Sequence, residues 1–253
     1  MSLPRVIPVL LLRNGGLVKT VNFKKHTYVG DPINAIKIFN EKEVDELAFI
    51  DIDATSQKRE PSYDFLTQIA SECFMPLAYG GAVQNEIQIE RLLKCGIEKV
   101  VINSAGLDRP DFLRSATFSF GSTTIVGSMD IKRNFWGNYQ VYNHVKATTL
   151  DIDPVAHAQY LQGCGVGEIF LNNVDNDGMM KGYDLELVKK ITSAVDLPVI
   201  ACGGAGGIND IDKVINEAGA SGAAAGSFFV FHGKHKAVLI TYPEYQTLQD
   251  IFK

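Results

Sequence analysis

The sequence predicts an α/β fold, a (β/α)8 barrel built from two similar (βα)4 halves. The first observation behind this prediction is a pattern that occurs twice, 123 residues apart. Gly80-Gly81-Ala82 is followed 23 residues later by Asn103-Ser104, and Gly203-Gly204-Ala205 is followed 23 residues later by Gly226-Ser227. In each copy a short apolar run enters the glycines, and a segment with helical periodicity leads to a second apolar run. The repeated unit is therefore strand, glycine loop, helix, strand and small-residue loop.

The second observation is that strand-like runs recur with room for a helix between them. The runs are continuously apolar rather than alternating, which is typical of a parallel sheet covered by helices. Eight such units in 253 residues match the size of a (β/α)8 barrel. The expected strands are Val6–Leu12, Leu47–Ile52, Pro76–Tyr79, Lys99–Asn103, Thr124–Met129, Glu168–Asn172, Pro198–Cys202 and Gly222–Ala225.

Helical patterns fill the intervals between these runs, and their ends carry the expected residues. Asp31-Pro32 opens one helix with proline in its first turn, and Gly96 and Gly219 follow two others as C-terminal glycines. The expected helices are Ile33–Glu43, Tyr63–Cys73, Glu86–Cys95, Pro154–Gly163, Leu185–Val195 and Ile208–Ala218.

The main competing fold is an open, doubly wound sheet, which usually has six strands and a G-x-G-x-x-G turn after the first. Here Arg13-Asn14-Gly15-Gly16-Leu17 follows the first run and lacks that spacing. Two halves that match in order favour closure into one barrel with a pseudo-twofold axis. Without a linker or low-complexity stretch, we expect a single domain over residues 1–253, with Lys132–Asp151 as a small hairpin over the barrel mouth.

Composition excludes several classes of partner. The net charge is −5 and no basic patch is present, so we expect no nucleic-acid partner. No apolar run approaches 18 residues and no signal peptide opens the chain, so we expect no membrane association. Widely spaced cysteines without a C-x-x-C indicate reduced thiols in a cytoplasmic protein; they are Cys73, Cys95, Cys164 and Cys202.

Chemistry in such a barrel lies at the C-terminal ends of the strands. Asp130 ends the fifth run, above an apolar core, and is a candidate for general acid–base work; a carboxylate that caps a neighbouring helix is the equal alternative. Because glycine loops and helix starts let backbone N–H groups approach an anion, the repeat suggests a ligand with phosphate at both ends. Asp175-Asn176-Asp177-Gly178 lacks the glutamate of a calcium loop. We expect neither a metal nor a cofactor.

A second group of charged residues lies at the opposite end, where four strand-like runs begin. The group consists of Arg5, Glu46, Lys99 and Glu168. Two positive and two negative side chains can pair there, since unpaired charges are costly to bury. Two interpretations stay open: a salt-bridged plug that closes the barrel, or a gate that a small neutral molecule must pass.

Together these residues resemble the cyclase subunit of imidazole glycerol phosphate synthase, from Arg5 to about His232. In that family a glutaminase subunit docks under the barrel, and ammonia passes a charged gate and reacts at the top with a bisphosphorylated ribonucleotide. The matching stretches are Asn22-Phe23, Gly30-Asp31-Pro32, Asp45-Glu46-Leu47, Lys99-Val100, Ile102-Asn103, Asp130-Ile131-Lys132-Arg133, Gly167-Glu168-Ile169, Asp177-Gly178, Gly182-Tyr183-Asp184 and Ala201-Cys202-Gly203-Gly204-Ala205-Gly206.

The resemblance implies roles for individual residues. It makes the four charged residues an ammonia gate, and it makes Asp130 and Lys19 catalytic. One implied phosphate site consists of Gly81, Asn103 and Ser104. The other consists of Asp177, Gly178, Gly204, Gly226 and Ser227.

One departure from the family pattern concerns catalysis. The family's second catalytic aspartate should end the first strand, where this chain has Leu11. Leucine exchanges no proton, and losing an acid–base group typically costs about 10²–10⁴-fold in rate. Ala82 also replaces a usual third glycine.

These departures resemble a paralogous branch associated with amidation of an N-acetyl sugar for surface polysaccharide. There the barrel and its glutaminase would supply ammonia to an ATP-dependent sugar amidotransferase. Two alternatives remain: a true cyclase of histidine biosynthesis that relies on Asp130, and a non-catalytic phosphate-binding scaffold that activates a glutaminase.

Overall fold

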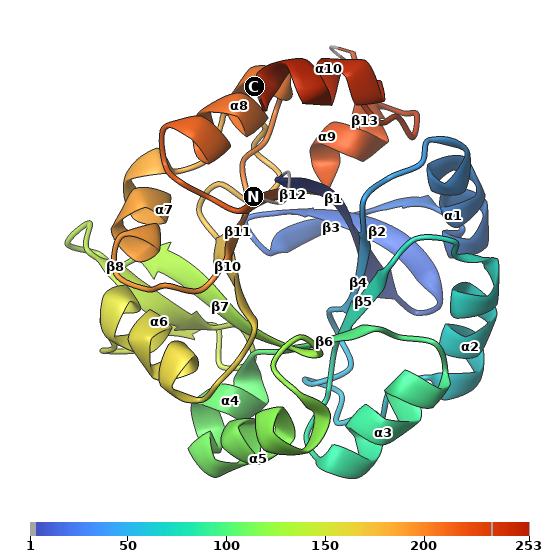
Figure 1. Cartoon of the computed structure of the whole chain (residues 1–253). Coiled ribbons are helices and arrows are strands. Elements are labelled where there is room, and N and C mark those ends of the chain that lie inside the picture. Colours follow the sequence, from blue (N-terminus) through green and yellow to red (C-terminus); the bar gives the residue numbers. More distant parts are fainter. Residues whose placement is uncertain (1–3, 234, 253) are drawn as a thin grey trace.

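Eight parallel strands close into a ring in the computed structural model of this chain, which describes residues 4–233 and 235–252 (Figure 1). Neighbours around the ring are hydrogen-bonded, and the pairing of β7 with β10 completes the circle that runs through β1 and β12. The predicted (β/α)8 barrel is confirmed. The ring strands are β1 (Arg5–Arg13), β4 (Leu47–Asp51), β5 (Leu77–Gly80), β6 (Lys99–Ile102), β7 (Ile125–Arg133), β10 (Glu168–Asn173), β11 (Val199–Cys202) and β12 (Gly222–Ala225).

Helices surround the ring (Figure 1), and the six predicted ones form with ends shifted by at most a few residues. Asp31 accepts a hydrogen bond from the Asn34 N–H and caps the first of them. Gly96 and Gly219 take φ angles of +97° and +73° after α3 and α8, as C-terminal glycines do. The helices are α1 (Pro32–Glu41), α2 (Tyr63–Glu72), α3 (Glu86–Lys94), α4 (Ser104–Asp108), α5 (Pro110–Phe120), α6 (Pro154–Gly163), α7 (Leu185–Thr192), α8 (Ile208–Asn216), α9 (Ser227–Val230) and α10 (Tyr245–Ile251). None is long and apolar enough to cross a membrane in the part of the chain that the structure describes.

Two apolar cores result from the alternation of side chains along each ring strand. Outward-facing residues such as Val6 and Leu10 pack under the helices. Inward-facing residues fill the barrel axis, because a ring of eight strands is just wide enough for side chains. The inner cluster consists of Ile7, Val9, Ala48, Ala78, Val101, Val126, Phe170, Ile200 and Ala224, with Leu11, Ile50 and Cys202 packed against it.

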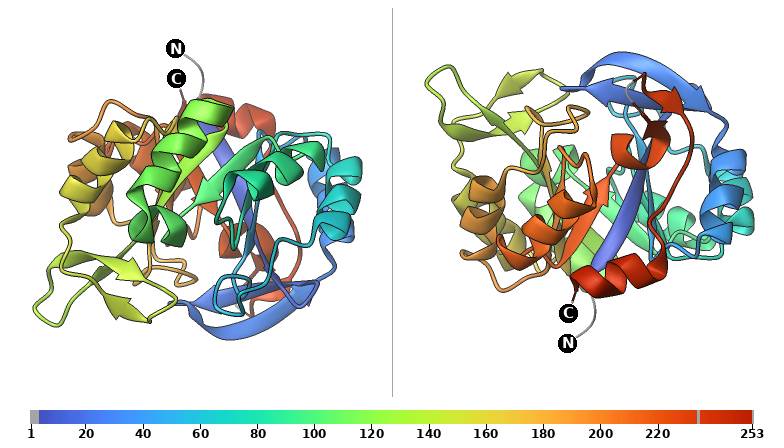
Figure 2. Two further views of the ribbon diagram at one scale, coloured as in Figure 1. Left: turned by 90° about the horizontal axis from the view of Figure 1, so that it is seen from below. Right: turned by 90° about the horizontal axis from the view of Figure 1, so that it is seen from above.

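The first strand of each half continues into an antiparallel hairpin. β2 (Gly16–Val21) and β3 (Lys24–Gly30) extend β1, while β8 (Tyr139–Asn143) and β9 (Thr148–Thr149) extend β7. Figure 2 shows both hairpins on the face opposite the chain termini. The second hairpin was predicted and the first was not. The missed signal is Asn14-Gly15, whose φ angles of +50° and +76° suit a two-residue hairpin turn.

Candidate functional site

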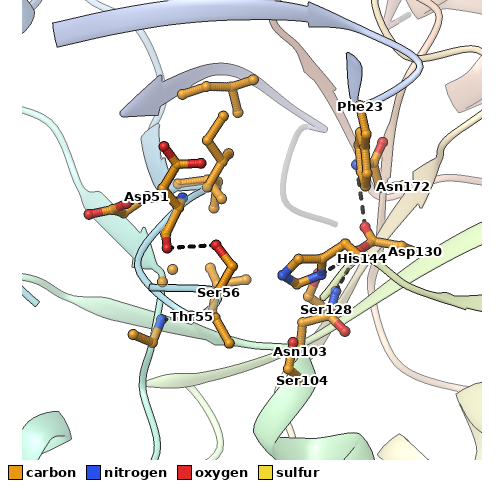
Figure 3. A pocket seen from close by; sticks show the side chains of 18 of the residues that line it. Phe23, Asp51, Thr55, Ser56, Asn103, Ser104, Ser128, Asp130, His144 and Asn172 are labelled. Carbon is orange, nitrogen blue, oxygen red and sulfur yellow. Dashed lines mark hydrogen bonds and ion pairs between the residues drawn. The ribbon is translucent and has the colours of Figure 1, made fainter. Parts of the chain in front are cut away.

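A cavity of about 550 Å³ opens at the C-terminal ends of the ring strands, between the two hairpins. The inner core forms its floor, through Val9, Val101 and Phe170. Polar side chains form its walls, and Figure 3 shows several of them directed inward. An apolar floor with a few convergent polar groups is the usual form of a small-molecule site.

Asp130 is nearly buried in the wall of this cavity, with 5% of its surface exposed. Asn103 Nδ2 donates a hydrogen bond to it at 2.8 Å, and Asn172 Nδ2 donates another at 3.4 Å. The Nδ1 atom of His144 lies 3.5 Å from Oδ2, the oxygen that also accepts from Asn103 (Figure 3). These partners are cavity side chains rather than helix amides, so this geometry favours the acid–base interpretation over the helix cap.

His144 was missed at the sequence level, although the hairpin that carries it was predicted. It lies in the turn after β8 and lines the cavity. Burial lowers the pKa of His144, but the hydrogen bond and the negative charge of Asp130 outweigh it and raise that pKa above its usual value. The cavity therefore holds an imidazole–carboxylate pair.

Lys19 lies on β2 and is 4% exposed. Burial lowers its pKa to about 8, against the opposing effects of the charges of Asp177 and Cys202. Its ammonium donates a hydrogen bond to the Val9 carbonyl. Gly226 makes room for this side chain, because a Cβ at that position would meet Lys19. The first hairpin thus places a cation in the cavity wall, opposite the hairpin that carries His144.

The first implied phosphate set lies on the cavity wall: Gly81, Asn103 and Ser104 all line it. Ala82, which replaces a glycine, keeps a positive φ of 53°. Its N–H donates to Thr55 Oγ1 at 3.1 Å.

The second implied phosphate set is only partly at the cavity. Asp177 and Gly226 line it, whereas Gly178, Gly204 and Ser227 are not among its lining residues. The first hairpin covers this set: Thr20 Oγ1 donates to the Asp177 carboxylate at 2.6 Å, and the Asn22 N–H donates to the Asp177 carbonyl at 2.9 Å. Their joint role as a phosphate site stays a prediction.

Ion pairs that sequence reasoning did not assign complete the opposite wall. Both oxygens of Asp51 accept from Arg59 Nη2, at 3.1 and 3.2 Å. Asp53 accepts from Arg13 Nε at 2.8 Å. Arginine pairs with these two carboxylates, whereas Asp130 pairs with a histidine, a group that can release its proton.

Leu11 lies where β1 reaches the cavity, in register with Ile50 of β4. It packs against the inner apolar cluster. The first strand therefore contributes a hydrocarbon surface at this point and no proton-exchanging group.

The four charged residues at the other end of the barrel meet as expected. Lys99 Nζ lies 2.6 Å from Glu46 and 3.0 Å from Glu168, and Arg5 hydrogen-bonds to both carboxylates. Each carboxylate thus contacts both cations in a closed ring of alternating charge. This ring spans the N-terminal end of an otherwise apolar interior.

The fold and these two ends define a (β/α)8 barrel with a polar-walled cavity at one end and a ring of ion pairs at the other. The chain belongs to the imidazole glycerol phosphate synthase HisF-like cyclase family: the family model for "Histidine biosynthesis protein" matches residues 5–236.

Individual relatives agree over almost the whole chain. "Putative imidazole glycerol phosphate synthase subunit hisF2" of Pseudomonas aeruginosa is 51% identical over 96% of this chain and 97% of its own length. The corresponding hisF3 protein of Vibrio vulnificus is 48% identical over 94% of this chain and 92% of its own. "Imidazole glycerol phosphate synthase subunit HisF" of Streptomyces griseus is 40% identical, over 90% of each chain.

Proposed function

We propose that this chain is a barrel subunit that carries ammonia from a glutaminase at its N-terminal face to the cavity at the opposite face. The observation that carries the proposal is the ring of Arg5, Glu46, Lys99 and Glu168. Buried ion pairs gain little net stability over apolar packing, so a charged closure of an apolar barrel favours a functional role. A neutral molecule of the size of ammonia suits such a gate.

The acceptor that we propose is an N-acetyl sugar of surface polysaccharide, amidated by a separate ATP-dependent sugar amidotransferase. Leu11 supports this part of the proposal, because it removes a proton-exchanging group from the cavity while the charged ring stays paired. We place this activity in the cytoplasm, consistent with four free cysteines.

Cyclase activity in histidine biosynthesis is the second candidate. The position of Asp130 favours it, together with the cavity-lining residues of the first phosphate set. A phosphorylated small molecule is the expected ligand in this case.

Isotope transfer tests the proposal. This chain would be mixed with the synthase-type glutaminase of its own organism, the sugar amidotransferase, ATP, amide-¹⁵N glutamine and excess unlabelled ammonium. A conduit predicts ¹⁵N-rich amidated sugar. If the ¹⁵N content of the amidated sugar equals that of the bulk ammonium, the chain is a scaffold that only activates the glutaminase. The proposal would be overturned if the glutaminase does not bind this chain and if its glutamine hydrolysis rate is the same with and without the chain.

A further inference from the structure

Both hairpins contribute proton-carrying side chains to the cavity, and His144 is the one that pairs with Asp130. Lys19 is fixed by the Val9 carbonyl and covered by its own hairpin. The side chain of His144 is 29% exposed and belongs to the cavity lining. Since Nδ1 faces Asp130, the other ring nitrogen, Nε2, is directed into the cavity (Figure 3).

We infer that His144 is the ligand-contacting acid–base group of this cavity, with Asp130 as the carboxylate that orients and charges it. The imidazolium can give one proton from Nε2 to a basic ligand atom and become neutral imidazole, and the reverse step restores it; no other bond changes. This deepens the second candidate function, cyclase activity, and rests on it only for the identity of the ligand, a phosphorylated small molecule.

The arrangement follows a general rule for histidine bases, in which a buried carboxylate on Nδ1 fixes the ring and stabilises its charged form. Asp130 itself is held by the Asn103 and Asn172 amides, so it cannot rotate freely away from the imidazole. His144 thus supplies a second proton-exchanging group to a cavity in which Leu11 supplies none.

Of the charged groups around His144, Asp130 is the one that sets the orientation and the charge of the imidazole. Asp130 pairs with the imidazole and is the charged group that raises its pKa. The other titratable groups that line the same cavity are Lys19, Lys24, His26, Asp51, Asp53, Asp108, Arg109, Tyr142, Asp177 and Cys202. Asp51 is neutralised by Arg59, and Asp177 accepts from Thr20 and the Phe23 N–H.

Histidine NMR on the barrel alone tests the inference. The His144 signal, assigned from His144→Gln, should titrate above pH 6.5. In Asp130→Asn its midpoint should fall, because the carboxylate charge that raises it is removed. Binding of inorganic sulfate, a phosphate mimic with constant charge in this range, should weaken about tenfold as pH rises through the wild-type midpoint.

The control is His26→Gln, because His26 lines the same cavity from β3. In His144→Gln the pH dependence of sulfate binding should shrink to the part that Lys19 contributes near pH 8, and in His26→Gln it should be unchanged. A His144 signal that ignores sulfate in the wild-type protein would overturn the inference, and this measurement needs no variant that might misfold. Loss of the pH dependence of sulfate binding in His26→Gln would also overturn the inference. No glutaminase is present in this test. The inference on His144 can therefore fail while ammonia transfer succeeds, and it can hold while ammonia transfer fails.

Discussion

The ammonium of Lys99 lies 2.6 Å from a carboxylate oxygen of Glu46 at the N-terminal end of the barrel, although 53 residues separate them in the sequence. The contact joins the starts of two ring strands, β4 and β6, across the barrel interior. It is one of the four ion pairs of a closed ring, in which Arg5 and Glu168 complete the alternation of charge. The ring gives the barrel a polar closure at its N-terminal end.

Lys99→Ala tests whether this closure is a gate or a plug. Arg5 still contacts both carboxylates in the variant, so we expect a loss of about 1–3 kcal/mol in unfolding free energy and an intact fold. Ammonia channelling should become less efficient, so bulk ammonium should dilute the ¹⁵N content of the amidated sugar more than with the wild-type chain. Lys94→Ala is the control, because Lys94 pairs with Glu90 on the helix surface. Collapse of the fold in Lys99→Ala alone would support the plug.

Leu11→Asp tests whether the missing carboxylate is what separates this chain from a cyclase. The new side chain would enter the cavity that Asp130 also lines. If the remaining site is intact, ammonia-dependent cyclase turnover should rise by about 10²–10⁴-fold. Leu11→Asn is the control, because it is polar but exchanges no proton. Absence of any gain, in a variant that still binds the phosphorylated substrate, would show that the cavity differs from a cyclase site in more than this residue.

Lys19→Met should stabilise the protein near neutral pH. The buried ammonium has a pKa of about 8 against 10.5 for a free lysine, so the folded state disfavours the proton. Between pH 8 and 10.5 the unfolded chain binds more protons, and wild-type stability therefore rises with pH. We expect Lys19→Met to be about 1–3 kcal/mol more stable below pH 8, with a difference that narrows toward pH 10.

Urea unfolding at several pH values measures this difference, with Lys25→Met on the exposed edge of the same hairpin as the control. Equal stability of Lys19→Met and wild type at every pH would contradict the burial argument. If Lys19→Met is more stable but inactive, the buried charge of Lys19 is kept for function at the expense of stability.

Gly178→Ala should loosen the first hairpin from the second phosphate set. Gly178 has a φ of +68°, and a Cβ there would collide with the Thr20 carbonyl. Gly15 has a similar φ of +76° but open space around it. Gly15→Ala should cost about 1 kcal/mol from backbone strain alone, and Gly178→Ala about 3 kcal/mol or more. Equal losses by thermal or urea unfolding would show that the hairpin is not tightly packed there.

The barrel was predictable because its signals are local. Continuous apolar runs and glycine loops predict parallel strands and their ends without knowledge of long-range contacts. The helices α4 and α9 were not predicted, since segments of five and four residues are too short for helical periodicity to show. The longer α5 does begin with Pro110 at a first-turn position, a signal that was present and not used.

The site was predictable in composition but not in its contacts. The end of the fifth apolar run selected Asp130 and the resemblance selected Lys19; the structure places both at one cavity. The resemblance could not select His144, because the contact depends on how a hairpin folds back over its own strand. Nor could it show that the first hairpin covers Asp177, since Thr20 reaches it across 157 residues of sequence.

The most direct test of the central claim, that this barrel conducts ammonia and does not run the cyclase reaction, is turnover of the bisphosphorylated ribonucleotide by the purified chain with an ammonium salt. The Streptomyces griseus HisF relative would be assayed beside it. We predict no turnover above background by this chain, in folded protein, under conditions in which the relative is active. Turnover at a comparable rate would contradict the claim and identify a working cyclase in which Leu11 is tolerated.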